Sequence, residues 1–128
     1  MNVMDEAFKV EYRGDHVHVV FGQSYTADPE WQDELWDRLR SICEEYNTRR
    51  VLAEGVLPAP DRPAAAVIEA GQRTATIPNL WLGFHFHDFA PTANTELYEV
   101  VAASHGVRVK FFNDADTALN WLRANAPK

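Results

Sequence analysis

The strongest constraint on the fold is a repeated alternation of strand-like and helix-like segments. Two period-2 runs, residues 8–13 and 16–22, flank Gly14-Asp15, and this spacing predicts an antiparallel hairpin. From the second strand onward, each predicted strand is followed by a predicted helix. Because βαβ crossovers are right-handed and join parallel strands, the second to fifth strands are predicted to be parallel. The order ββαβαβαβα thus predicts an α/β fold with a mainly parallel five-stranded sheet.

Local signals indicate where the helices begin and end. Asp28-Pro29 is a typical helix start, and either Asn94 or Thr95 is expected to cap the third helix. Gly106 stands where a helix end favours glycine, and Asn113 is expected to cap the last helix. The first helix has an apolar stripe of Trp31, Leu35, Leu39, Ile42 and Tyr46. The remaining strands are predicted at 49–56, 81–87 and 107–112, and a helix rich in small residues at about 63–75.

The predicted strands present two chemically different faces. One face is apolar and carries Val17, Val19, Phe21, Leu82, Phe84, Phe86, Val107, Val109 and Phe111. The other face is polar and carries His16, His18, His85, His87, Arg108 and Lys110. Since parallel strands covered on both faces usually read as continuous apolar runs, this alternation predicts helices stacked mostly on one face. The second face is then expected to contact water or a partner.

Composition narrows the class of protein. The 12 Lys and Arg against 19 Asp and Glu give a net charge of −7, which disfavours nucleic acid or an anionic membrane as the main partner. The single Cys43 cannot form an internal disulfide, no apolar run is long enough to span a membrane, and the first residues lack a signal-peptide pattern. We expect one cytoplasmic domain over residues 1–128.

The order of elements, the opening hairpin, the "RRVL" strand and the closing "VRVKFFNDADTALNWL" resemble the STAS domain of anti-sigma factor antagonists. The chain is most similar to the small stand-alone bacterial proteins described as STAS-like, over roughly residues 8 to 124. The resemblance implies a sequential βα superhelix and a regulatory, protein-binding role without a cofactor.

One feature of that family is missing. The resemblance implies a phosphorylatable Ser or Thr at the start of the helix after the third strand, but the matching residues 55–73 contain neither. Asp61 lies where that helix would begin, and a carboxylate cannot be switched by a kinase. Asp61 is therefore either a fixed negative charge kept on the family scaffold or simply a helix N-cap.

The stretch "WLGFHFHDF" is the segment that most suggests chemistry. His85 and His87 would lie on one strand face with Cα atoms about 6–7 Å apart, a spacing that permits two ligands to one metal. A catalytic zinc needs three protein ligands, and Asp88 would point to the opposite face. His16 and His18 would be separated from this strand by the third strand. We therefore expect imidazoles on a sheet face, with no metal.

Two classes of function are consistent with these residues. No GxSxG, Walker or GxGxxG pattern occurs, and Cys43 lies beside an apolar stripe, so enzymatic activity is not expected. The first class is a protein-interaction module that uses the polar sheet face, an edge strand or the 57–63 loop, with Asp61, Arg62, His85 and His87 as binding residues. The second is a carrier or sensor of a small apolar ligand or lipid, bound beside Ala66 between the 63–75 helix and the sheet. This second class is implied by the fold resemblance between STAS domains and CRAL-TRIO lipid carriers.

Self-association is a further expectation. An uncovered sheet face or exposed strand edge is a plausible contact surface, and two-fold dimers are the commonest homo-oligomers. We expect a homodimer formed through the histidine-bearing part of the sheet or through its edge, weakening as the imidazoles become protonated.

Overall fold

The computed structural model describes residues 8–22, 29–55, 63–86 and 92–126. Among these, five strands and four helices follow one another in the predicted order. The elements are β1 (Phe8–Tyr12), β2 (Val17–Phe21), α2 (Pro29–Glu45), β3 (Arg50–Gly55), α3 (Ala64–Thr74), β4 (Trp81–Phe86), α4 (Ala93–Ser104), β5 (Arg108–Phe112) and α5 (Ala115–Asn125). The protein is therefore an α/β protein, as the sequence predicts.

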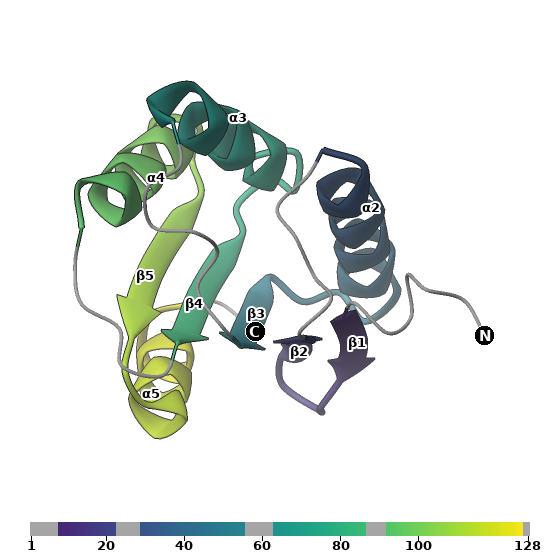
Figure 1. Ribbon diagram of the computed structural model, residues 1–128. Coiled ribbons are helices and arrows are strands. Elements are labelled where there is room, and N and C mark those ends of the chain that lie inside the picture. Colours follow the sequence, from purple (N-terminus) through teal and green to yellow (C-terminus); the bar gives the residue numbers. More distant parts are fainter. Residues whose placement is uncertain (1–7, 23–28, 56–62, 87–91, 127–128) are drawn as a thin grey trace.

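The strands lie side by side in sequence order, β1-β2-β3-β4-β5 (Figure 1). β1 runs antiparallel to β2, whereas β2 to β5 pair in parallel, so the sheet is mixed and the prediction of a mainly parallel sheet is corrected. The antiparallel pair results from the tight turn at Gly14, whose φ of +91° suits glycine. Arg13 N donates to His16 O at 2.8 Å and closes this turn.

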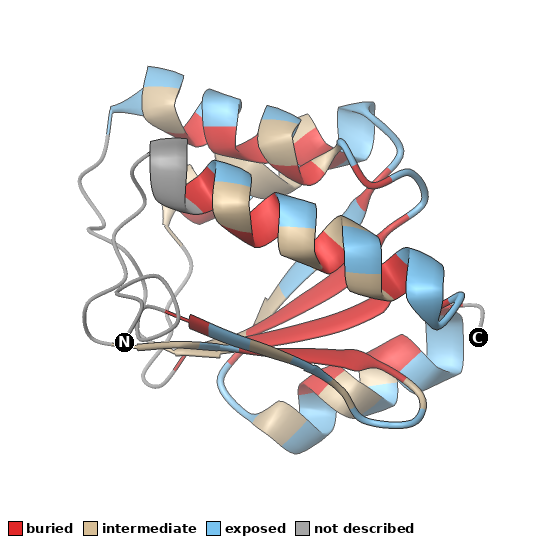
Figure 2. Ribbon diagram, turned by 90° about the vertical axis from the view of Figure 1, so that its right-hand side faces the viewer, coloured by how far each residue is buried: buried red, intermediate tan, exposed pale blue. Residues whose placement is uncertain are grey.

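The main core lies between the sheet and α2, α3 and α4, which cover one face (Figures 1 and 2). Period-2 alternation places the apolar side chains of neighbouring strands on this face, where helix residues such as Leu35 and Leu39 meet them. Tyr46 follows α2 instead of ending its buried stripe, and it is 46% exposed. The buried strand residues of this core are Phe8, Val17, Val19, Val51, Ala53, Leu82, Phe84 and Phe86.

α5 lies on the opposite face, which the sequence pattern leaves open (Figure 2). Its apolar residues Ala118 and Leu122 pack in a second, smaller core with Leu52 and Phe112. α5 packs directly on β4, and a Cβ built on Gly83 would lie at an ordinary contact distance of 3.6 Å from that of Ala118. The expectation of an uncovered polar face is therefore wrong beneath α5, since apolar residues of α5 and of this face bury each other.

Three helix starts differ from the sequence prediction. The N-cap of α3 is Pro63, which forms no side-chain cap, so Asp61 is not the N-cap of this helix. The N-cap of α4 is Thr92, whose side chain accepts from Thr95 N while the Thr95 side chain accepts from Thr92 N, so neither Asn94 nor Thr95 is the cap. The N-cap of α5 is Asp114 and not Asn113. For α4 and α5 a suitable side chain lies within a few residues of the predicted one, and backbone geometry selects it. Gly106 follows α4 with a φ of +85°, as predicted.

None of the helices in the described part of the chain combines the length and apolar character needed to cross a membrane.

Candidate functional site

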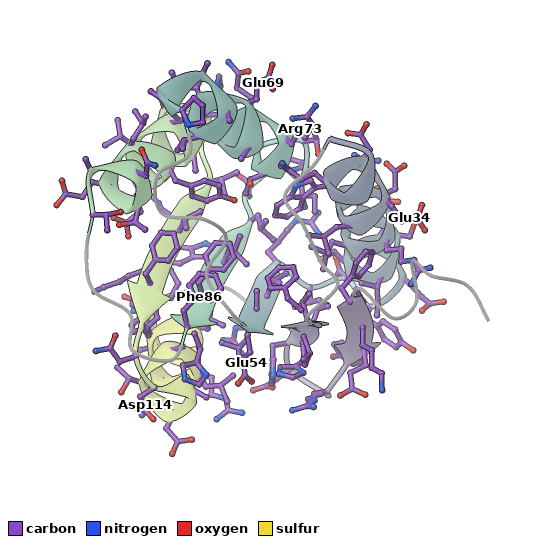
Figure 3. The ribbon with its side chains drawn as sticks, viewed as in Figure 1. Glu34, Glu54, Glu69, Arg73, Phe86 and Asp114 are labelled. Carbon is purple, nitrogen blue, oxygen red and sulfur yellow. The ribbon has the colours of Figure 1, made fainter. Side chains whose placement is uncertain are left out.

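A carboxylate on the central strand joins two histidines from the strands on either side. Glu54 Oε1 accepts from His18 Nε2 at 2.5 Å, and Glu54 Oε2 accepts from His85 Nδ1 at 2.9 Å. Figure 3 shows Glu54 on the α5 side of the sheet, away from Phe86 on the main-core side. We call these three residues the Glu54 site.

Strand register brings the three side chains together. Glu54 pairs with His85 on β4 and with Val20 on β2, so His18 lies diagonally across from it. Residues two apart on a strand share a face, and diagonal neighbours remain within reach of long side chains. Glu54 and His85 are each the last residue but one of their strands. The site therefore lies toward the carboxyl ends of the parallel strands, where open α/β sheets commonly bind ligands.

The Glu54 site is partly buried, and its carboxylate is ionised. The side chain of His18 is 5% exposed, that of Glu54 27% and that of His85 23%. Burial opposes ionisation of Glu54, but hydrogen bonds from the two histidines outweigh it and hold the pKa of Glu54 below its ordinary value. Glu54 is therefore ionised at neutral pH.

The ionised carboxylate determines the histidine tautomers. A carboxylate only accepts hydrogen bonds, so the protons are assigned to Nε2 of His18 and Nδ1 of His85. His85 then keeps Nε2 for another partner, as an acceptor when neutral and a donor when protonated. This carboxylate-oriented imidazole can bind a hydrogen-bonding group or exchange a proton with one.

α5 begins near this site. Its N-cap Asp114 lies on the same side of the sheet as Glu54 (Figure 3). Hydrogen bonds from Thr117 lower the pKa of Asp114, and the charge of His85 makes a smaller contribution in the same direction. The open nitrogen of His85 therefore belongs to a locally acidic surface.

A second polar cluster fixes the other end of α5. Asp15 accepts from His16 Nδ1 at 2.6 Å and from Arg123 Nε at 2.7 Å. Arg50 donates to the carbonyl oxygen of Ala126 at 2.9 Å. The Arg123 and His16 contacts lower the pKa of Asp15 to about 2. Since the contacts of Arg123 and Ala126 join α5 and its end to the hairpin and to β3, the cluster holds α5 across the sheet.

The sequence-predicted site residues do not all meet. His85 belongs to the Glu54 site, whereas Asp61, Arg62 and His87 lie outside the described residues. Ala66 lies on α3, on the opposite face of the sheet from Glu54. Within the described ranges, no group of three or more His, Cys, Asp or Glu side chains is arranged to hold a metal ion.

Glu54 is the site residue that sequence reasoning missed. The available signal was a single carboxylate in the otherwise apolar run "VLAEGV", between two strands that both carry alternating histidines. The expectation that the third strand separates His18 from His85 is confirmed. The separation does not isolate the two histidines, because the intervening strand supplies the carboxylate that connects them.

The small residues of α3 serve close helix packing. A Cβ built on Gly71 would lie 2.7 Å from Cγ1 of Val101 on α4, closer than two such atoms can approach. Ala70 and Gly71 are both buried. The absence of a side chain at position 71 therefore lets α3 and α4 come together.

A scan against models of known protein families found no match, and searches of the curated proteins and of the solved structures also found none.

Proposed function

We propose that this protein is a non-enzymatic regulatory or protein-interaction module of the STAS-like type, without the phosphorylatable residue, and that it binds its partner through the Glu54 site. The order ββαβαβαβα and the sequential sheet support the STAS-like part of the proposal. The observation that carries the rest is the partly exposed pair of Glu54 and His85, held on neighbouring strands by a 2.9 Å hydrogen bond.

The chemistry of this pair suits recognition. Both oxygens of Glu54 already accept from an imidazole, yet each has a further lone pair for a donor from a partner. His85 Nε2 adds a second, adjacent hydrogen-bonding position. Since strands position side chains more rigidly than loops do, the two groups present a fixed pattern to a partner surface.

The charge of the site suggests the chemistry of the partner. The net charge is −7, and Asp114 adds a carboxylate near His85. A partner surface whose charge is opposite to that of the site would associate with it faster, and a partner of like charge would be repelled. We therefore propose a partner protein that presents a Lys or Arg side chain to Glu54.

The alternative function is a carrier or sensor of a small apolar ligand between α3 and the sheet. The close approach of Gly71 to Val101 accounts for small residues of α3 without a ligand. This observation favours the interaction module over the carrier.

Native mass spectrometry of the protein purified from its own host tests the proposal. We expect a bound protein mass that is lost with Glu54→Gln, because the amide is neutral and its nitrogen cannot accept a hydrogen bond. Glu69→Gln is the matched control, since Glu69 lies exposed on α3, far from Glu54 (Figure 3). A bound lipid-sized mass would instead support the carrier. Turnover of an ester or phosphate substrate that disappears with His85→Ala would overturn a non-enzymatic role.

A further inference from the structure

β1 forms one edge of the sheet, and its outward-facing backbone groups can be assigned from the hairpin. Arg13 N donates to His16 O, and hydrogen-bonded pairs alternate along an antiparallel ladder. Glu11 therefore exchanges hydrogen bonds with His18, and Lys9 with Val20. The backbone N–H and C=O of Val10 consequently point away from β2. In the described part of the chain no further strand pairs with this side of β1.

The side chains of β1 are complementary to a second copy of β1. Lys9 and Glu11 lie on the same face of the strand, one residue to each side of Val10, and both are exposed. If two β1 strands pair antiparallel about Val10, the two Val10 residues exchange both backbone hydrogen bonds. Lys9 of each copy then lies opposite Glu11 of the other. These are non-hydrogen-bonded pairs, in which opposite side chains come closest.

The backbone and side-chain requirements thus select the same register. A shift of the centre by one residue would bring Lys9 or Glu11 to the dyad and place it opposite its own copy. In the shifted pairing, the backbone groups at the centre of the contact would be those of Lys9 or Glu11, which already form hydrogen bonds with β2. Both effects disfavour the shifted pairing.

The other edge of the sheet is protected against the same contact. β5 carries Arg108 and Lys110, both exposed and on one face. Antiparallel self-pairing about Val109 would place Arg108 opposite Lys110 of the second copy. Cations at an edge strand are a common protection against pairing, and here they make the two edges unequal.

Among the described residues, no helix lies across the outer edge of β1. Figure 2 looks onto the β1 side and shows α2 above the strands, not across their edge. Tyr46 stacks on Tyr12 with ring centroids 4.0 Å apart and is 46% exposed. This ring adds apolar surface beside the edge that a second copy can cover.

We propose that the protein forms a two-fold homodimer in which β1 pairs antiparallel with β1 of a second copy, centred on Val10, so that one sheet continues through both copies. The contact is isologous and closed, because each β1 edge is used once. The contact uses none of the three residues of the Glu54 site, although Glu11 Oε1 lies 3.9 Å from Nδ1 of His18. A monomeric parent would leave the proposed function of that site unaffected.

Charge reversal tests the register directly. Lys9→Glu places two carboxylates opposite each other at both pairs, and Glu11→Lys places two ammonium groups there. Each variant alone is expected to weaken dimerisation at least about tenfold by sedimentation velocity at neutral pH. Mixing the two variants restores both attractive pairs, so we expect a heterodimer from two separately weakened proteins. The double variant Lys9→Glu with Glu11→Lys is expected to dimerise like the parent.

A backbone variant provides a second test. Val10→Pro removes the outward N–H at the centre of the contact but none of the hydrogen bonds between β1 and β2. We expect a folded monomer, with the fold checked by circular dichroism and the melting temperature. A monomeric parent at high micromolar concentration would overturn the proposal. So would a dimer that is insensitive to the charge reversals and does not form a heterodimer on mixing.

Discussion

Replacing Gly71 with alanine tests whether α3 and α4 are in direct contact or leave space for a ligand. A Cβ at position 71 would lie 2.7 Å from Cγ1 and 3.0 Å from Cβ of Val101. Val101 is β-branched and has little freedom about χ1, so its side chain cannot rotate away easily. The added methyl group must therefore push the two helices apart.

The expected magnitude is a balance of two opposing effects. Overpacking costs about 1–3 kcal/mol, whereas alanine is better than glycine in a helix by about 1 kcal/mol. The net loss in the free energy of unfolding is then about 1 kcal/mol. In a chain of 128 residues this corresponds to a fall of roughly 3–5 °C in melting temperature.

A double-mutant cycle separates the two effects. In a Val101→Ala background the closest contact atom is gone, so Gly71→Ala is expected to become neutral or stabilising. Gln72→Ala, at an exposed position of the same helix, is the matched control and should change stability little. Chemical denaturation of the four proteins of the cycle measures the coupling. Stabilisation by Gly71→Ala in the parent would show that room exists beside α4, and it would favour the ligand carrier.

Gly83, Asp15 and Cys43 each allow a further test. Gly83→Ala should stabilise the protein by about 0.5 kcal/mol in urea denaturation, because the new Cβ meets its nearest neighbours at 3.6 Å and the unfolded chain loses freedom. Asp15→Asn should lower the melting temperature at pH 7, and its difference from the parent should shrink as the pH falls below 4. The pKa of Asp15 is lowered to about 2, so its stabilisation is present above its ordinary pKa and lost on acidification through about 2. Because the Asp15 side chain is 35% exposed, we expect only about 1 kcal/mol. Burial raises the pKa of Cys43 to about 11, so alkylation of the native protein at pH 8 should be at least about a hundredfold slower than in denaturant; equal rates would contradict this burial.

Much of the architecture is already present in local sequence patterns. Period-2 runs and helix-length intervals determine the order of elements, and Gly14 specifies the hairpin that makes the sheet mixed. The alternation in β2 and β4 also identifies the strand face that lines the main core, because a period-2 pattern can be read from neighbouring residues alone. These features depend on residues close together in the chain, so the sequence by itself determines them.

Tertiary structure decides what depends on distant residues. The stripe of Ala118 and Leu122 would suit either face of the sheet, and only packing against Leu52 and Phe112 places α5 opposite the other helices. The Glu54 site arises in the same way. His18 is separated from Glu54 by 36 residues, and Glu54 from His85 by 31, and each side chain alone is an ordinary polar residue on a strand. Their connection requires the order and register of three strands, because hydrogen bonds between strands place residues side by side that the chain itself keeps far apart.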